Sequence, residues 1–277
     1  MRDRNKITFI ITLFFLCGCV NLTAVNDFAK ESSVISANKA MLDDSDAQTE
    51  ARKYDSSYPD PNSADFKNRL AVTNRALDAL NAYMSVLAQL SANDVSNVSS
   101  DFNTIGSELK ALNVTDPAVQ KGVSATSALV DLLLNSVVRS DIKKLLINSA
   151  QPVADITGYL IDQAQTTANT YVQAIAVTNK YWGDLTSQTD RDKEFCKTAH
   201  LCETVYVLAT RTRDADAAVL AKKNAAAMAA VKAFAKIQSD NAALVKNADH
   251  LDAKNLVDLL KADEPDLKTA INNLRAL

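Results

Sequence analysis

Residues 201–247 read LCETVYVLATRTRDADAAVLAKKNAAAMAAVKAFAKIQSDNAALVKN, and this stretch decides the fold. It contains no glycine and no proline, the two residues that most often break a helix. Alanine fills much of its second half, at positions 225, 226, 227, 229, 230, 233 and 235. Small side chains let two helix backbones approach closely. We therefore expect one long helix over 201–247, packed tightly against a neighbour.

A second long helix is predicted over residues 153–182. Its apolar and small side chains recur three or four residues apart, as on one face of a helix; they are Val153, Ile156, Leu160, Ala164, Thr167, Tyr171 and Ala174. Pro152 is expected in its first turn or at a kink, and a polar break over 183–197 separates it from the next helix. Two consecutive long helices joined by a short connection favour an antiparallel pair.

Shorter helices are expected on the amino-terminal side of this pair. Residues 64–90 carry a seam with alternating spacings of four and three, which is typical of a bundle. The two prolines within residues 54–63 end the preceding segment, and Ser63 is placed to cap the helix that follows. Further helix starts or pieces are predicted at 95–112, at Asp116-Pro117, at 142–147 after Ser140-Asp141, and at Asp263-Glu264-Pro265.

The glycine content sets both the fold class and what chemistry to expect. The whole chain contains five glycines, whereas sheets need frequent turns rich in Gly, Asn-Gly or Pro. Loops that cradle phosphate and the Gly-flanked nucleophile elbow also need closely spaced glycines. The sequence therefore predicts an all-α, elongated antiparallel helical bundle, with its two long helices joined at a tip, and no such enzyme motif.

Two cysteines, Cys196 and Cys202, lie at that tip. In an oxidising compartment such a pair is most simply a disulfide that pins the turn. Free thiols are an alternative, and a metal site formed with His200 is another. Zinc sites usually have four protein ligands, or three and a water, and no further Cys or nearby His is present. The predicted fold therefore has a disulfide-pinned tip and no metal or other cofactor.

The amino terminus has the three-part order of a secretory signal. Basic residues open the chain, Ile7 to Leu16 form an apolar stretch of ten residues, and Leu16-Cys17-Gly18-Cys19 closes it. A helix needs about 20 residues to cross a bilayer core, so a permanent span is disfavoured. The closing tetrapeptide resembles the lipobox of bacterial lipoproteins, with Cys17 as a mild departure from the usual small residue.

That resemblance implies that residues 1–18 are removed and that Cys19 carries the lipid. Val20 and Asn21 follow, rather than an Asp that favours retention, so the resemblance favours the outer membrane facing the periplasm, with the inner membrane as the alternative. We divide the chain into a signal peptide over 1–18, a tether or loosely packed helix over 19–63, and a helical bundle domain over 64–277.

Charge and catalytic residues argue against several function classes. The net charge is −3 with no basic block, which gives no electrostatic case for nucleic acid. His200 and His250 lie in no recognisable catalytic spacing, and Asp43-Asp44 is interpreted as solvated charge in a polar break. We name no catalytic residue.

The leading hypothesis is a non-enzymatic envelope lipoprotein that binds a protein partner or acts as a scaffold. A protein that neutralises a toxin and an assembly factor are two forms of it, and homo-oligomerisation is a further possibility. Tyr181 and Trp182 are a possible contact surface, because aromatic side chains are favoured interface anchors, or else plugs at the end of a bundle. The alternative function is a lipid-anchored hydrolase or small-molecule carrier with a site inside the bundle.

Overall fold

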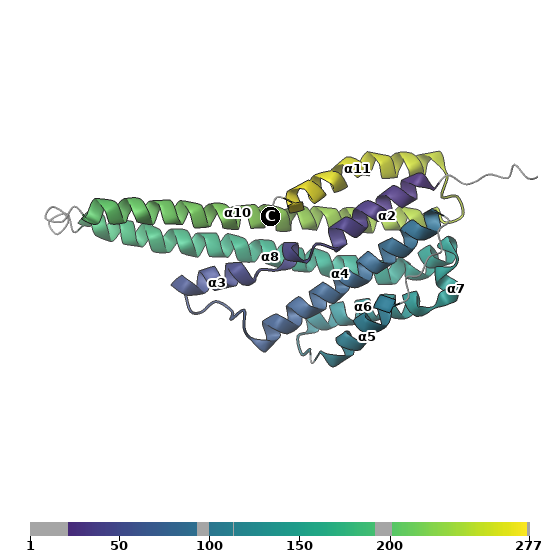
Figure 1. The fold of residues 1–277 in the computed structure, drawn as a ribbon, viewed down its shortest axis with the longest axis horizontal. Coiled ribbons are helices and arrows are strands. Elements are labelled where there is room, and N and C mark those ends of the chain that lie inside the picture. The colour runs from purple at the N-terminus through teal and green to yellow at the C-terminus, as the bar shows by residue number, and fades with distance from the viewer. Residues whose placement is uncertain (1–21, 93–99, 113, 192–200, 276–277) are drawn as a thin grey trace, which may run out of the picture.

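The computed structural model describes residues 22–92, 100–112, 114–191 and 201–275. Throughout these residues the regular structure is helical, with no strand, so the all-α prediction is confirmed. The molecule is elongated, and its two longest helices lie antiparallel side by side along the long axis (Figure 1). These are α8, Ile142–Arg191 with 50 residues, and α10, Leu201–Lys246 with 46 residues.

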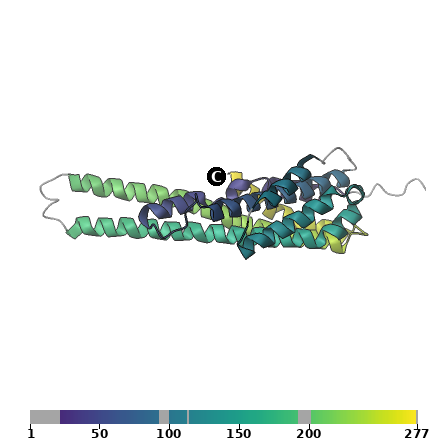
Figure 2. The ribbon, with the colours of Figure 1, turned by 90° about the horizontal axis from the view of Figure 1, so that it is seen from below.

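Shorter helices surround one half of the α8–α10 pair and form the body of the molecule (Figures 1 and 2). One continuous hydrophobic core contains side chains from nearly all of them. The helices of the body are α2 (Thr23–Ser36), the 3-10 helix η2 (Lys39–Leu42), α3 (Ser45–Tyr54), α4 (Ala64–Ser91), α5 (Ser100–Ala111), α6 (Pro117–Leu134), α7 (Ser136–Arg139) and α11 (Lys254–Arg275). The other half of the pair extends from this body as a two-helix hairpin.

Two predicted helix starts are confirmed by their caps. The Ser63 hydroxyl accepts a hydrogen bond from the Phe66 backbone N–H at 3.3 Å, and α4 follows. The Asp116 carboxylate accepts hydrogen bonds from the N–H groups of Ala118 and Val119 at 2.7 and 3.3 Å, ahead of Pro117 in the first turn of α6. Each cap satisfies backbone donors that have no partner within the helix.

Two other predicted boundaries were wrong. We expected a short piece over 142–147 and then a separate long helix with Pro152 in its first turn or at a kink. Instead α8 starts at Ile142, where Ser140-Asp141 predicted a start, and continues through the proline. Asp141 caps this earlier start by accepting hydrogen bonds from the N–H groups of residues 143 and 144. Leu145 and Leu146 are fully buried and hold the first turns in the core, which offsets the hydrogen bond that proline removes. At its other end α8 continues to Arg191, across most of the predicted polar break.

Pro265 likewise lies inside a helix rather than at its start. α11 begins at Lys254, nine residues before the predicted signal at 263–265. Its buried stripe runs across the proline without a change of phase, with Leu256 and Leu260 on one side and Leu267 and Ile271 on the other. Pro265 itself is exposed. Burial of this continuous apolar face holds the helix together across the proline.

The segment expected to be a tether or a loosely packed helix contributes fully to the core where it is described. On α2, Val25, Phe28 and Ile35 are buried against the other helices, as are Met41 and Leu42 of η2. The apolar stripe of this segment is thin in the sequence, but small Ala and Ser residues flank it and allow close approach. Within the described residues no helix combines the length and the apolar character needed to cross a membrane.

Candidate functional site

The half of α8 and α10 that extends from the body is the first candidate surface. We call it the distal hairpin: residues 172–191 of α8 and 201–219 of α10. Its described surface carries large exposed apolar side chains, with Leu208 exposed by 64% and Val219 by 55%. The others are Val172, Tyr181, Tyr206 and Val207. These side chains are spread along both helices of the distal hairpin, which makes the hairpin a candidate contact surface.

The aromatic residues singled out in the sequence lie on this hairpin, next to α3. The ring of Tyr181 lies 4.5 Å from that of Tyr54 and 5.4 Å from that of Trp182, measured between centroids. The Tyr54 and Trp182 rings are 6.3 Å apart in an edge-on arrangement. Tyr181 remains 44% exposed, so this three-ring cluster covers the end of α3 and also faces solvent. Burial raises the pKa of the Tyr54 hydroxyl.

The other residues predicted to matter lie outside the description. Cys19, Cys196 and His200 fall in the undescribed ranges, and for Cys202 only the helical backbone of α10 is described. The lipid site therefore stays a prediction, and so do the disulfide, free-thiol and metal alternatives for the tip. His250 is exposed in the turn after α10. Among the described residues, no group of three His, Cys, Asp or Glu side chains is arranged to hold a metal ion.

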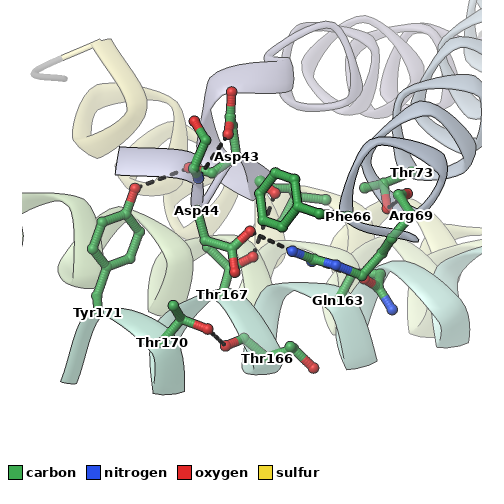
Figure 3. Close-up of polar contacts among 12 residues, drawn as sticks. Asp43, Asp44, Phe66, Arg69, Thr73, Gln163, Thr166, Thr167, Thr170 and Tyr171 are labelled. Carbon is green, nitrogen blue, oxygen red and sulfur yellow. Dashed lines mark hydrogen bonds and ion pairs between the residues drawn. The ribbon is translucent and has the colours of Figure 1, made fainter. Parts of the chain in front are cut away.

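A buried ion pair lies in the body, near the base of the distal hairpin (Figure 3). Asp44, just before α3, is fully buried, and its Oδ1 lies 2.6 Å from Nη2 of Arg69 on α4. The other guanidinium nitrogen of Arg69 donates a 3.4 Å hydrogen bond to Gln163 Oε1 of α8. The guanidinium carbon also lies 4.8 Å from the centre of the Phe66 ring. One arginine thus joins the η2–α3 junction, α4 and α8.

Two hydrogen bonds fix the same junction to α8. The Tyr171 hydroxyl donates to the backbone carbonyl of Asp43 at 2.9 Å, and the Thr167 hydroxyl donates to that of Leu42 at 3.4 Å (Figure 3). Burial, followed by the nearby carboxylates, raises the pKa of Tyr171, so this hydroxyl remains a donor. The turn before α3 is therefore held over the part of α8 where the body ends and the hairpin begins.

This network overturns the interpretation of Asp43-Asp44 as solvated charge. Asp44 is buried because α3 and η2 fold back onto α8, and Arg69 lies within reach from α4. Position 69 is 25 residues along the chain from Asp44, with two prolines between them, so no helical spacing links the pair. Arg69 follows the polar residues Lys67 and Asn68 in the sequence, so nothing in the local pattern marked it as the partner of a buried carboxylate.

Comparison with known proteins adds no relative: no protein-family model, no curated protein and no solved structure matches this chain.

Proposed function

We propose that this chain is a non-enzymatic envelope lipoprotein that presents its distal hairpin to a protein partner in the periplasm. The observation that carries the proposal is the projection of α8 and α10 beyond the body (Figures 1 and 2). Large apolar side chains are exposed on both of these helices. A long two-helix element offers an extended binding surface on a rigid scaffold. Exposed apolar side chains on it gain free energy when a partner covers them.

The position of the expected anchor supports this arrangement. Helix α2 begins at the end of the body opposite the free end of the distal hairpin (Figure 1). An acylated Cys19 would come four residues before it, so the hairpin would point away from the membrane surface. Two or three acyl chains hold a protein far more firmly than one. We place the anchor in the outer membrane.

We also propose that a Cys196–Cys202 disulfide braces the tip. A cross-link between residues six apart closes a short loop, for which chain entropy gives about 2 to 3 kcal/mol at most. The brace would limit fraying where α8 ends and α10 begins, and so would keep the exposed side chains of both helices in register.

The binding proposal is tested with a photo-crosslinking amino acid at Leu208, in cells that express the full chain. Ile147 is the matched control, because it is 50% exposed and apolar but lies in the body. We expect one discrete protein adduct from position 208 and none from 147, identified by mass spectrometry. Equal adducts at both positions, or none at either, would contradict the proposal. An adduct formed only with a second copy would replace the partner by a homo-oligomer.

The anchor is tested by replacing Cys19 with Ser, with Cys17→Ser as the control. We expect the Cys19 variant to leave the membrane fraction after a carbonate wash and the Cys17 variant to remain there. Retention of the Cys19 variant would refute lipid anchoring at this residue. For the tip, thiol labelling of Cys196 and Cys202 without reductant would refute the disulfide.

A further inference from the structure

Helix α11 packs against α2 and α10, and a carboxyl group meets another carboxyl group at each of these two contacts (Figure 1). On α10, Asp240 is fully buried and lies beside Asp263 of α11. On α2, the Glu31 side chain is 15% exposed and lies near Glu264 of α11. Because residues 263 and 264 are adjacent in the sequence, a single turn of α11 brings both pairs together.

The buried oxygens of these pairs lack hydrogen-bond donors. Both carboxyl oxygens of Asp240 and Oε2 of Glu31 are buried and have no donor in the described part of the protein. A buried carboxylate without donors costs free energy, and a second carboxylate beside it adds repulsion. A proton on one member of each pair would remove the repulsion and would also supply a donor between the two carboxyl groups. The docked position of α11 is therefore linked to protonation.

The lysines at this junction leave both buried groups without full compensation. Among the described ion pairs, Lys236 pairs with Asp263 rather than with Asp240. Lys268 is half exposed and reaches the Glu31 carboxylate at 3.6 Å. Carboxyl groups also outnumber the lysines around the two pairs. The other charged side chains that α2, α10 and α11 bring to this junction are Asp27, Lys261 and Asp266.

The two other helices that pack on this part of α10 contact it through uncharged groups. The Tyr83 hydroxyl of α4 donates to Asn241 Oδ1 at 2.7 Å, and burial raises the pKa of this tyrosine, so it stays neutral. The backbone carbonyl of Ala154 on α8 accepts a 2.9 Å hydrogen bond from Gln238. The acidity of the junction is therefore set by α2, α10 and α11.

The direction of the pKa shifts agrees with this geometry. Burial first, and then the neighbouring Asp263, raise the pKa of Asp240 to about 8, whereas Lys236 opposes the rise. Burial is also the largest cause of the raised pKa of Glu31. A raised carboxyl pKa means that the protonated form is favoured in the docked state and that rising pH works against docking.

We propose that α11 is a proton-dependent clamp: it stays docked while Asp240 and Glu31 hold protons, and it leaves α2 and α10 when these groups ionise. Release gives both carboxylates access to water. It also uncovers an apolar surface, because Leu260 and Leu267 of α11 and Phe28 of α2 are buried against one another in the docked state. The proposal is independent of the distal hairpin, and either can fail without the other.

Only α11 has to move in this transition. The described turn over residues 247–253 connects it to α10 and provides the hinge. Helix α2 keeps its own attachment to α4, since Asn26 donates to the Ala88 carbonyl at 2.7 Å and Ser33 donates to Asn81 at 2.6 Å. Opening of one helix while the rest of a body stays folded is a common form of local unfolding.

The test is hydrogen exchange of the purified full-length chain at pH 5 and pH 8, corrected for the intrinsic effect of pH on exchange. Loss of one proton on opening raises the opening constant by up to tenfold per pH unit in this range. We expect the opening constant of α11 to rise at least tenfold more than that of α4. An equal rise in both helices would show global destabilisation and overturn the clamp. No rise in α11 would overturn it as well.

Variants assign the effect to the carboxyl pairs. Asp240→Asn combined with Glu31→Gln places a permanent amide donor at each contact, so the change in α11 between pH 5 and pH 8 should shrink to about twofold or less. Asp131→Asn combined with Asp258→Asn is the matched control, because it removes two exposed carboxylates. This control should keep the full change. A tenfold change that persists in the Asp240 and Glu31 variant would overturn the proposal.

His250→Asn is a second control, because histidine commonly changes its charge between pH 5 and pH 8 and His250 lies in the hinge. Its variant should keep the full change in α11, and loss of the change there would assign it to the hinge and overturn the proposal. Circular dichroism of every variant is recorded at both pH values. If the Asp240 and Glu31 variant fails to fold, the comparison of α11 with α4 in the wild type still decides.

Discussion

The body and the distal hairpin use the same two helices in different ways. Within the body, α8 and α10 are surrounded by other helices, and the largest fully buried side chains of α10, such as Phe234 and Ile237, lie there. On the hairpin side of Leu220, Ala209 is the only buried side chain described on α10. Helix α3 covers one side of the hairpin, and only at its base. The body is therefore stabilised by a large core, and the hairpin by helix propensity and a narrow seam. The least buried part of a fold is where binding surfaces are commonly found.

The largest contrast is expected from matched truncations on α10. Phe234→Ala removes a fully buried ring and should lower the free energy of unfolding by about 3 to 5 kcal/mol. Leu208→Ala on the hairpin should change it by less than about 0.5 kcal/mol, because this side chain is 64% exposed. Urea denaturation followed by circular dichroism measures both. A Leu208 variant as unstable as the Phe234 variant would show that another part of the chain covers the hairpin.

The ion pair at the border of the two regions should come next in size. Arg69→Met leaves the fully buried Asp44 carboxylate without its cation, at a cost of about 3 kcal/mol. Arg75→Met is the control on the same helix. Arg75 pairs with Asp78 and Glu108 at 2.8 and 2.6 Å, but these partners are partly exposed, and the loss should stay below about 1 kcal/mol.

Hydrogen exchange refines this second test. Loss of Arg69 should raise exchange first in α3, since the junction before α3 is what the pair fixes to α4 and α8. Adding Asp44→Asn to Arg69→Met removes the unpaired charge and should restore part of the lost stability. Failure of that double variant to recover would mean that packing of the arginine stem, rather than charge, dominates.

The free energy of unfolding should depend on pH through a buried carboxyl group of the body. Asp240 of α10 is fully buried, neither of its oxygens has a donor in the described protein, and Asp263 of α11 lies beside it. Burial first, and then the neighbouring carboxyl, raise the pKa of Asp240 to about 8 from its ordinary 3.8, although Lys236 opposes the rise. The protonated form is favoured in the folded state. The free energy of unfolding is therefore unaffected by Asp240 below about pH 4, and it falls as the pH rises from about 4 to about 8.

Asp240→Asn tests that effect, because an amide keeps the shape, carries no charge and can donate to Asp263. The free energy of unfolding of the wild type should fall by a few kcal/mol between about pH 4 and pH 8. We expect this fall to be absent in the Asp240→Asn variant. Asp258→Asn, on an exposed position of α11, serves as control and should leave the slope unchanged. A wild-type unfolding free energy that does not fall across this range would contradict the assignment.

The difference between body and hairpin also explains what the sequence could predict. Helix class and the seam of α4 follow from local periodicity and from caps such as Ser63 and Asp116, which depend on neighbouring residues only. Pro265 was misread as a helix start, and Pro152 was expected in a first turn or at a kink, because local rules make a proline a boundary. At Pro152 and Pro265 the burial of a continuous apolar face outweighs that preference, and burial depends on distant helices.

The candidate sites were harder to predict for the same reason. Tyr181 and Trp182 stand out as aromatic residues and do lie together, with Tyr54 from another helix completing the cluster. The Asp44–Arg69 pair and its contact with Gln163 combine segments separated by prolines and by 94 residues between Arg69 and Gln163. Side-chain spacing along one helix carries no information about such a meeting.

The smallest effects should have opposite signs at two glycines. At Gly122 on α6 a Cβ atom would lie 2.6 Å from the Tyr159 ring, whereas at Gly183 on the hairpin no atom of the described residues lies within 4 Å of it. Alanine favours a helix by about 1 kcal/mol over glycine, but overpacking costs about 1 to 3 kcal/mol. Gly183→Ala should therefore stabilise by about 0.5 to 1 kcal/mol. Gly122→Ala should destabilise by about 1 kcal/mol, because Tyr159 is held by a 3.1 Å hydrogen bond to Thr73 and gives way with difficulty. Thermal unfolding of the two variants measures both signs, and stabilisation at Gly122 would mean that the body is packed as loosely as the hairpin.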